Sequence, residues 1–155
     1  MSDETNEDSG AGAKGTVDLR VENASLLTPA GLVTGDNGVA VDGETIVAVG
    51  RTDSLPPARR TIDCEGLIVA PGIVDEHVHD RSLGQRHKED WETLTRSAAA
   101  GGVTTVLGHG NTDPFVERPG DVARKLDLAA ADAIVDFGCF AWITEENYDL
   151  LEPLS

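Results

Sequence analysis

Apolar and polar residues alternate through much of the first half of the chain. Val17, Leu19 and Val21 are separated by single charged residues, a pattern that predicts a half-buried β-strand. Asp42-Gly43 lies between two apolar runs and suits the tight turn of a hairpin, so residues 38–49 are predicted to form a β-hairpin. Further strand-like runs cover residues 25–28, 38–41, 45–49, 61–64 and 67–70. The pattern therefore predicts a small β unit over residues 16–70.

The spacing of the apolar residues changes at Pro71. An apolar run over residues 73–79 predicts another strand, and Trp91, Leu94 and Ala98 then recur at helical spacing within a predicted helix from Asp90 to Ala100. Gly101-Gly102 should end that helix. Further alternation predicts strands at 103–107 and 134–140, a helix at 121–131 and a short helix at 144–151 that Thr144 opens. Strands alternating with helices indicate parallel βαβ units, so residues 71–155 are predicted to be α/β.

Composition narrows the classes of function. The net charge is −16, from 28 acidic and 12 basic residues, which disfavours binding to nucleic acid or to an anionic membrane. Only three of the basic residues are lysines, and an acidic, lysine-poor composition is typical of halophilic proteins, with an ordinary acidic protein as the alternative. Residues 1–15 are polar and acidic and are expected to form a disordered tail. No apolar run approaches the ~20 residues of a spanning helix, so a cytoplasmic location is expected.

The run from Pro71 to His79 carries the clearest chemistry. Alternate side chains of a strand share a face, so Asp75, His77 and His79 should point the same way and both imidazoles should reach one point. Neutral imidazole is a common ligand of zinc-class cations, which makes His77 and His79 candidate metal ligands. Asp75 is expected to hold a ring N–H of one histidine and fix its tautomer. The alternative is a pair of surface histidines at a strand end, but all four histidines of the chain fall within residues 77–109.

Several motifs occur in the order found in one enzyme family. Pro71-Gly-Ile-Val-Asp-Glu-His-Val-His79 is followed by Arg81, by His87-Lys-Glu-Asp-Trp-Glu92, by Ala98-Ala-Ala-Gly-Gly-Val-Thr-Thr105 and by Asn111-Thr-Asp-Pro114. From about Val17 onward the chain resembles the N-terminal part of the cyclic amidohydrolases, which include dihydroorotase, allantoinase and hydantoinase. Dihydroorotase is the nearest match.

The resemblance implies a fold and a cofactor. It implies that residues 16–70 form a small β-sandwich and that residues 71–155 form the first three β/α units of a truncated (β/α)8 TIM-type barrel, which normally has eight such units. It also implies a binuclear zinc centre, held in part by His77 and His79. The family's bridging lysine and general base would lie beyond this chain, so no catalytic residue is expected within it. The chain is accordingly expected to be inactive alone.

The resemblance also implies substrate contacts. Arg81 matches an arginine that binds the substrate carboxylate, and Asn111 matches a substrate-binding asparagine; for both, a solvated loop residue is the alternative. Where the family usually has Arg-Glu-Pro-Gly and Met-Pro-Asn-Thr, this chain has Arg81-Ser-Leu-Gly84 and His109-Gly-Asn-Thr112. His109 is interpreted as a loop histidine, with an added polar contact as the alternative.

Four functions are left open. The first is hydrolysis of a small cyclic amide by a dihydroorotase, converting dihydroorotate to N-carbamoyl-aspartate. Allantoinase and hydantoinase or dihydropyrimidinase activities are the second and third. The fourth is a non-catalytic relative that serves as a binding or scaffold protein. A homo-oligomer is compatible with each of them.

Overall fold

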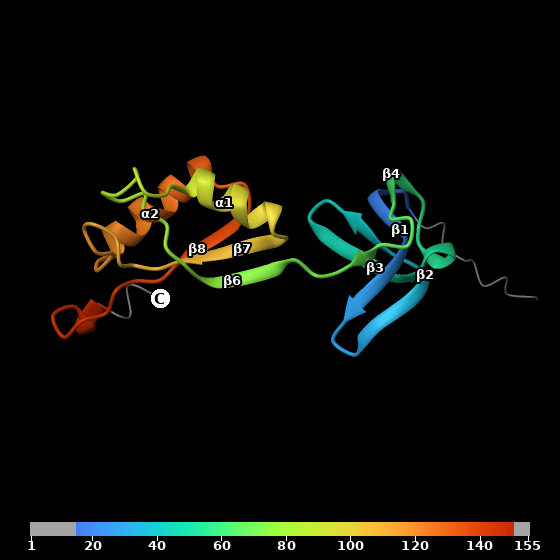
Figure 1. The fold of residues 1–155 in the computed structure, drawn as a ribbon, viewed down its shortest axis with the longest axis horizontal. Helices are drawn as coiled ribbons and strands as arrows, with labels where there is room; N and C mark the ends of the chain where they lie inside the picture. Colours follow the sequence, from blue (N-terminus) through green and yellow to red (C-terminus); the bar gives the residue numbers. More distant parts are fainter. Residues whose placement is uncertain (1–14, 151–155) are drawn as a thin grey trace, which may run out of the picture. The chain divides into compact units, whose positions relative to one another are not determined.

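The computed structural model describes residues 15–150, so the acidic tail predicted for residues 1–15 lies almost wholly outside the described residues. The chain divides into two compact units, Met1–Pro71 and Gly72–Ser155. Figure 1 shows the ribbon of both units. Over its described residues the first unit is all β, apart from one turn of 3-10 helix, and the second alternates strands and helices.

The first unit holds one five-stranded sheet. Its strands run in the order β3-β2-β1-β4, and β5 also pairs with β1. Pairing is antiparallel between β1, β2 and β3, whereas β4 and β5 lie parallel to β1. The elements are β1 (Val17–Thr28), β2 (Gly31–Asp42), β3 (Thr45–Arg51), η1 (Thr52–Ser54), β4 (Ala58–Asp63) and β5 (Ile68–Val69).

The predicted hairpin is confirmed, with a turn shifted by one residue. β2 and β3 are joined through Gly43 and Glu44, and Gly43 has a φ of 57°, which glycine adopts without steric cost. Its N–H donates to Asp18 Oδ2 at 2.8 Å. Two separate runs predicted at the start of the chain form the single strand β1, whose pairing with β2 is irregular near Asn23. The alternation of apolar and polar residues is interrupted at this irregularity, so the sequence pattern alone could not show that the two runs form one continuous strand.

The buried core of the first unit is small. Val17, Ala40 and Leu55 form one buried cluster with alanines packed against it, and Ala24 and Leu26 are also buried. Other apolar side chains of the same sheet stay exposed, among them Ile46 at 63% and Val49 at 60%. They border an apolar pocket of about 240 Å³ whose lining includes Val21, Leu26, Leu27, Val39, Ile46 and Val49. Much of the apolar surface of this sheet is therefore left open within the unit.

The second unit is a parallel α/β layer, as the alternating pattern predicted. The sheet order is β6-β7-β8 with parallel pairing throughout, and Figure 1 shows both helices on one face of the sheet. Trp91, Val106 and Ala129 form the buried core between helices and sheet. The elements are β6 (Ile73–Val78), α1 (Trp91–Ala100), β7 (Val103–Gly108), α2 (Pro119–Asp132), β8 (Asp136–Cys139) and η2 (Tyr148–Leu150).

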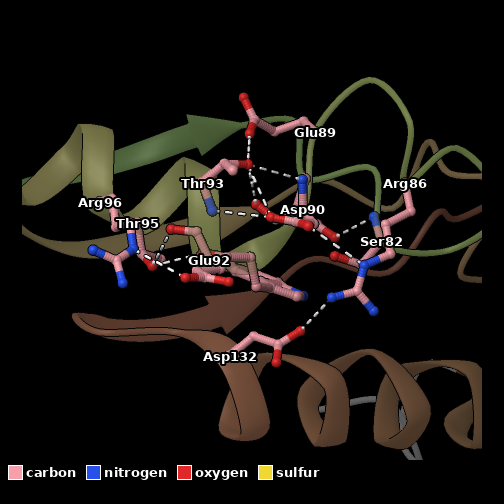
Figure 2. A network of polar contacts seen from close by, with 11 residues as sticks. Ser82, Arg86, Glu89, Asp90, Glu92, Thr93, Thr95, Arg96 and Asp132 are labelled. Atoms are coloured by element: carbon pink, nitrogen blue, oxygen red, sulfur yellow. Dashed lines mark hydrogen bonds and ion pairs between the residues drawn. The ribbon is translucent and has the colours of Figure 1, made fainter.

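Helix α1 ends at Ala100, as predicted, and begins at Trp91, one residue after the predicted start. Asp90 caps it by accepting a hydrogen bond from the Thr93 N–H at 2.9 Å, and Gly101 follows its last turn. Figure 2 shows this cap, together with Arg86, which pairs with Asp90 at 3.4 Å and with Asp132 at the end of α2 at 2.9 Å. Arg86 thus links the loop before α1 to the second helix.

Three predicted elements of the second unit differ from the structure, and in the first unit β2 and β4 begin earlier than the predicted runs 38–41 and 61–64. Helix α2 starts at Pro119 rather than at residue 121, because proline fits the first turn of a helix. Strand β8 is shorter than the predicted 134–140. The α-helix predicted at 144–151 is instead a turn followed by η2, and residue 151 lies outside the described part of the chain. Asn147 fixes that turn by accepting from the Thr144 N–H at 2.7 Å and donating to the Trp142 carbonyl at 2.7 Å.

Among residues 15–150, none of the helices is long and apolar enough to cross a membrane.

Candidate functional site

The carboxyl ends of β6 and β7 bring the candidate residues together. His77 lies near the end of β6 and His79 directly follows it; His109 directly follows β7, and Asn111 comes two residues later. Parallel pairing places these two ends at the same edge of the sheet. The ring centroids are 5.2 Å apart for His77 and His79, 3.9 Å for His77 and His109, and 5.4 Å for His79 and His109. We call these three residues the histidine cluster; His87 lies exposed in the loop before α1.

Asn111 determines which nitrogen of His79 carries the proton. The Nδ1 atom of His79 lies 2.9 Å from Asn111 Oδ1. Because an amide oxygen can only accept a hydrogen bond, Nδ1 is the donor and carries the hydrogen. The lone pair of the neutral ring is then on Nε2, which is the atom left to bind a metal ion. Asn111 therefore contacts a candidate ligand, which the sequence had not predicted.

Arg81 and Asn111, both predicted to bind substrate, also contact each other. Arg81 Nη1 donates to the main-chain carbonyl of Asn111 at 2.9 Å, and both residues are half-buried. This bond uses one of the five N–H donors of the guanidinium group. The contact links the segment after β6 to the segment after β7, beside the histidine cluster.

Asp75 takes part in the strand rather than in a ring contact. Its Oδ1 accepts a hydrogen bond from the main-chain N–H of His77 at 3.0 Å. The hydrogen-bond partner of the His79 ring is the amide of Asn111. That Asp75 fixes the tautomer of a ligand therefore stays a prediction.

His109 is a loop residue that directly follows β7, as predicted. The centroid of its ring lies 3.9 Å from that of His77 and 5.2 Å from that of Phe140. Burial lowers the pKa of His109, and the neighbouring His77 and His79 lower it further. The neutral ring, which is the form that can accept a hydrogen bond or bind a metal, is therefore favoured.

Asp80 and Lys125 were missed at the sequence level. Lys125 Nζ lies 2.6 Å from Asp80 Oδ2, and both side chains are fully buried. Lys125 occupies the inner side of α2, in helical register with Val122 and the buried Ala129. A lysine within an apolar stripe is a signal that could have identified this residue, and Asp80 directly follows the candidate ligand His79.

The donor set fits part of a metal site. His77 and His79 offer two imidazoles at one edge, and the contact with Asn111 leaves Nε2 of His79 available. Within residues 15–150, no group of three or more histidine, cysteine, aspartate or glutamate side chains is arranged to hold a metal ion. A catalytic zinc ion usually has three protein ligands and water. The two histidines therefore fit a site to which other residues also contribute.

Parallel β/α units with His-x-His near the carboxyl end of one strand are compatible with a metal-dependent hydrolase. The Dihydro-orotase-like family matches residues 66–145, which is more than half of the chain. The chain belongs to this family of cyclic amidohydrolases.

The individual relatives are named after several different activities. A dihydroorotase from Streptococcus pyogenes is 40% identical over 116 residues, which are 75% of this chain and 27% of that protein. An allantoinase from Deinococcus radiodurans is 38% identical over 144 residues, 90% of this chain and 31% of that protein. The chain thus spans less than a third of the length of either relative.

Solved structures agree with this assignment. The L-hydantoinase (dihydropyrimidinase) from Arthrobacter aurescens matches with a TM-score of 0.75 and 30% identity over 81% of this chain and 28% of that one. A D-hydantoinase matches with a TM-score of 0.74 and 26% identity over 88% of this chain and 30% of that one.

Proposed function

We propose that the chain supplies the N-terminal part of a cyclic amidohydrolase active site and that the ring opened is dihydroorotate, giving N-carbamoyl-aspartate. The observation that carries this proposal is the meeting of His77, His79, Arg81 and Asn111 at one edge of a parallel sheet. Barrel enzymes place their chemistry at the carboxyl ends of their strands. Family membership selects hydrolysis of a ring C–N bond among the reactions that such an edge could support.

The proposed fold extends this architecture. Residues 71–155 would be the first three β/α units of a (β/α)8 barrel, and residues 16–70 a small β-sandwich subdomain. The parallel order β6-β7-β8 supports the barrel, since consecutive strands are neighbours in it. The open apolar surface of the first sheet supports the sandwich, because a second layer would bury it.

The proposed cofactor is zinc, as a binuclear centre to which this chain contributes His77 and His79. A zinc ion bound there would supply Lewis-acid activation of water and of the scissile carbonyl. The residues of this chain do the positioning: Asn111 accepts from Nδ1 of His79 and so presents Nε2, while Asp75 braces the main chain at His77. No general base is assigned within the chain, and we propose that the chain alone is inactive.

Metal analysis tests the cofactor. With two ligands, the 155-residue chain should bind zinc weakly and lose it on exhaustive dialysis. The His79→Ala variant should bind less than wild type in a titration against a zinc-sensitive dye, whereas His87→Ala, which changes an exposed loop histidine, should match wild type. Tight, stoichiometric zinc in the dialysed chain would contradict the partial site, and equal binding by His79→Ala would contradict the ligand assignment.

Arg81 separates the candidate substrates. Dihydroorotate carries a carboxylate that a guanidinium group can bind, whereas dihydrouracil has the same ring without that charge. We propose to replace the matching segment of the Streptococcus pyogenes dihydroorotase by residues 66–145 and to measure kcat/KM on both rings. Arg81→Ala should lower kcat/KM for dihydroorotate by roughly 30-fold more than for dihydrouracil, since a charge-assisted contact contributes about 2 kcal/mol.

Arg86→Ala is the matched control for Arg81→Ala. Arg86 lies in the same loop but pairs with Asp90 and Asp132, away from the histidine cluster, so its loss should affect both rings alike. Equal losses on the two rings in Arg81→Ala would remove the carboxylate argument. Allantoinase would then become the better candidate, because the allantoinase relative matches 90% of this chain, against 75% for the dihydroorotase.

A further inference from the structure

The ion pair between Asp80 and Lys125 lies directly beneath the candidate site. Both side chains are 0% exposed, whereas the other ion pairs within residues 15–150 all keep part of each side chain in solvent. Removing two charges from water is costly, and a buried pair is often no more stabilising than apolar residues of the same volume. Stability alone therefore does not account for charges at this position.

The contacts of Lys125 join two strand ends. Its Nζ contacts Asp80 Oδ2 at 2.6 Å and donates to the main-chain carbonyl of His109 at 2.5 Å. Asp80 follows β6 and His109 follows β7, so one ammonium group from α2 holds both ends. On the other side of the carboxylate, Asp80 Oδ1 accepts from the Ser82 N–H at 3.4 Å.

The same strand ends carry the groups that must meet in the site. His79 precedes Asp80, and Asn111 lies two residues beyond His109, so the contact between His79 Nδ1 and Asn111 Oδ1 depends on the separation of the two ends. We propose that Asp80 and Lys125 are a positioning pair, which fixes the separation of the β6 and β7 ends and thereby holds the His79 ring against Asn111. As far as His79 is a metal ligand, this proposal rests on the proposed function.

Four variants separate positioning from stability. Asp80→Leu with Lys125→Met replaces the pair by apolar side chains of similar length, and Lys125→Met alone leaves the buried carboxylate without its partner. Asp80→Asn keeps the shape but removes the charge, in case the double variant fails to fold. Arg86→Met is the matched control, since it removes the cation of an exposed ion pair in the same unit.

The primary measurement is ¹⁵N NMR of the histidine rings in the metal-free chain, with urea denaturation to establish that each variant is folded. Wild type and Arg86→Met should show His79 as a single tautomer with hydrogen on Nδ1. The folded double variant and folded Asp80→Asn should lose this signature and show the mixed tautomers of an imidazole without a fixed partner. Lys125→Met should show the same loss where it remains folded.

An unchanged His79 tautomer in a folded double variant or in folded Asp80→Asn would overturn the proposal, and so would unfolding of all three variants, which would indicate a purely stabilising pair. A zinc titration then tests the link to function. The double variant should bind zinc about 10-fold more weakly than wild type, as is typical when a group that orients a ligand is lost. Wild type that binds no zinc, but keeps the His79 signature, would contradict the proposed function and leave the positioning pair intact.

Discussion

Gly108→Ala should destabilise the second unit because the structure leaves no room for a methyl group at that position. Gly108 is the last residue of β7 and is buried. A Cβ atom there would lie 2.6 Å from Asp80 Oδ2, 3.1 Å from the Trp91 ring and 3.3 Å from Lys125 Cε. All three neighbouring side chains are 0% exposed, so none can move aside into solvent. The new methyl group must therefore displace the ion pair or the main chain.

The size of the effect follows from overpacking. Inserting a carbon into a filled core typically costs 1–3 kcal/mol, and the closest atom here is a charged oxygen held by Lys125, so we expect about 2 kcal/mol. Urea denaturation followed by tryptophan fluorescence would measure this loss, because Trp91 is fully buried in the same core.

Gly120→Ala is the matched control. Gly120 lies in the first turn of α2 with nothing within 4 Å of its added Cβ, so alanine there should leave the stability unchanged or raise it by about 0.5–1 kcal/mol. A Gly108→Ala chain as stable as wild type would refute the claim that the space between Asp80, Trp91 and Lys125 is filled.

Two further predictions concern helix α1. Thr95→Val should lower the free energy of unfolding by about 1–3 kcal/mol, because the buried Thr95 hydroxyl donates to the Trp91 carbonyl at 2.6 Å and accepts from the Ile134 N–H at 3.2 Å. Thr95→Ser keeps the hydroxyl and should cost less. Equal costs for the two variants would contradict the role given to these hydrogen bonds. The Thr93 N–H lowers the pKa of Asp90 below 3.8, so the stability that the ionised cap contributes is complete at neutral pH and is lost as the pH falls through the lowered pKa. Acid titrations of wild type and Asp90→Asn should therefore converge below that pKa, and curves that stay parallel would show that the cap is not ionised.

The sequence was sufficient to predict an element where its hydrophobic pattern agrees with the burial seen in the structure. The strand that carries His77 and the helix from Trp91 to Ala100 have a clear period and defined ends, and each lies within one residue of its predicted bounds. The parallel order β6-β7-β8 followed from their alternation with helices. Parallel strands end at one edge, so the residues that follow β6 and β7 lie at the same edge, but the contact between His79 and Asn111 was not predicted.

The sequence was insufficient where a side chain competes with the helical main chain. The residues after Thr144 have a helical composition, yet the Asn147 amide donates to the carbonyls of Glu117 and Trp142, and the chain forms a turn instead. Glu117 is 30 residues from Asn147. A contact over that distance depends on the fold and leaves no trace in local periodicity.

The buried pair shows why the site could be only partly predicted. Asp80 and Lys125 are 45 residues apart, and neither was predicted to belong to the site. Their pairing becomes visible only when α2 packs over the ends of β6 and β7, where the same ammonium group also holds the His109 carbonyl. His79 and Asn111, whose polar side chains lie at the edge of the sheet, can be recognised in the sequence by their residue type. Asp80 and Lys125 cannot, because their role depends on burial and on a contact between distant parts of the chain. A charged residue predicted on the inner stripe of a helix therefore indicates a partner beneath a strand end.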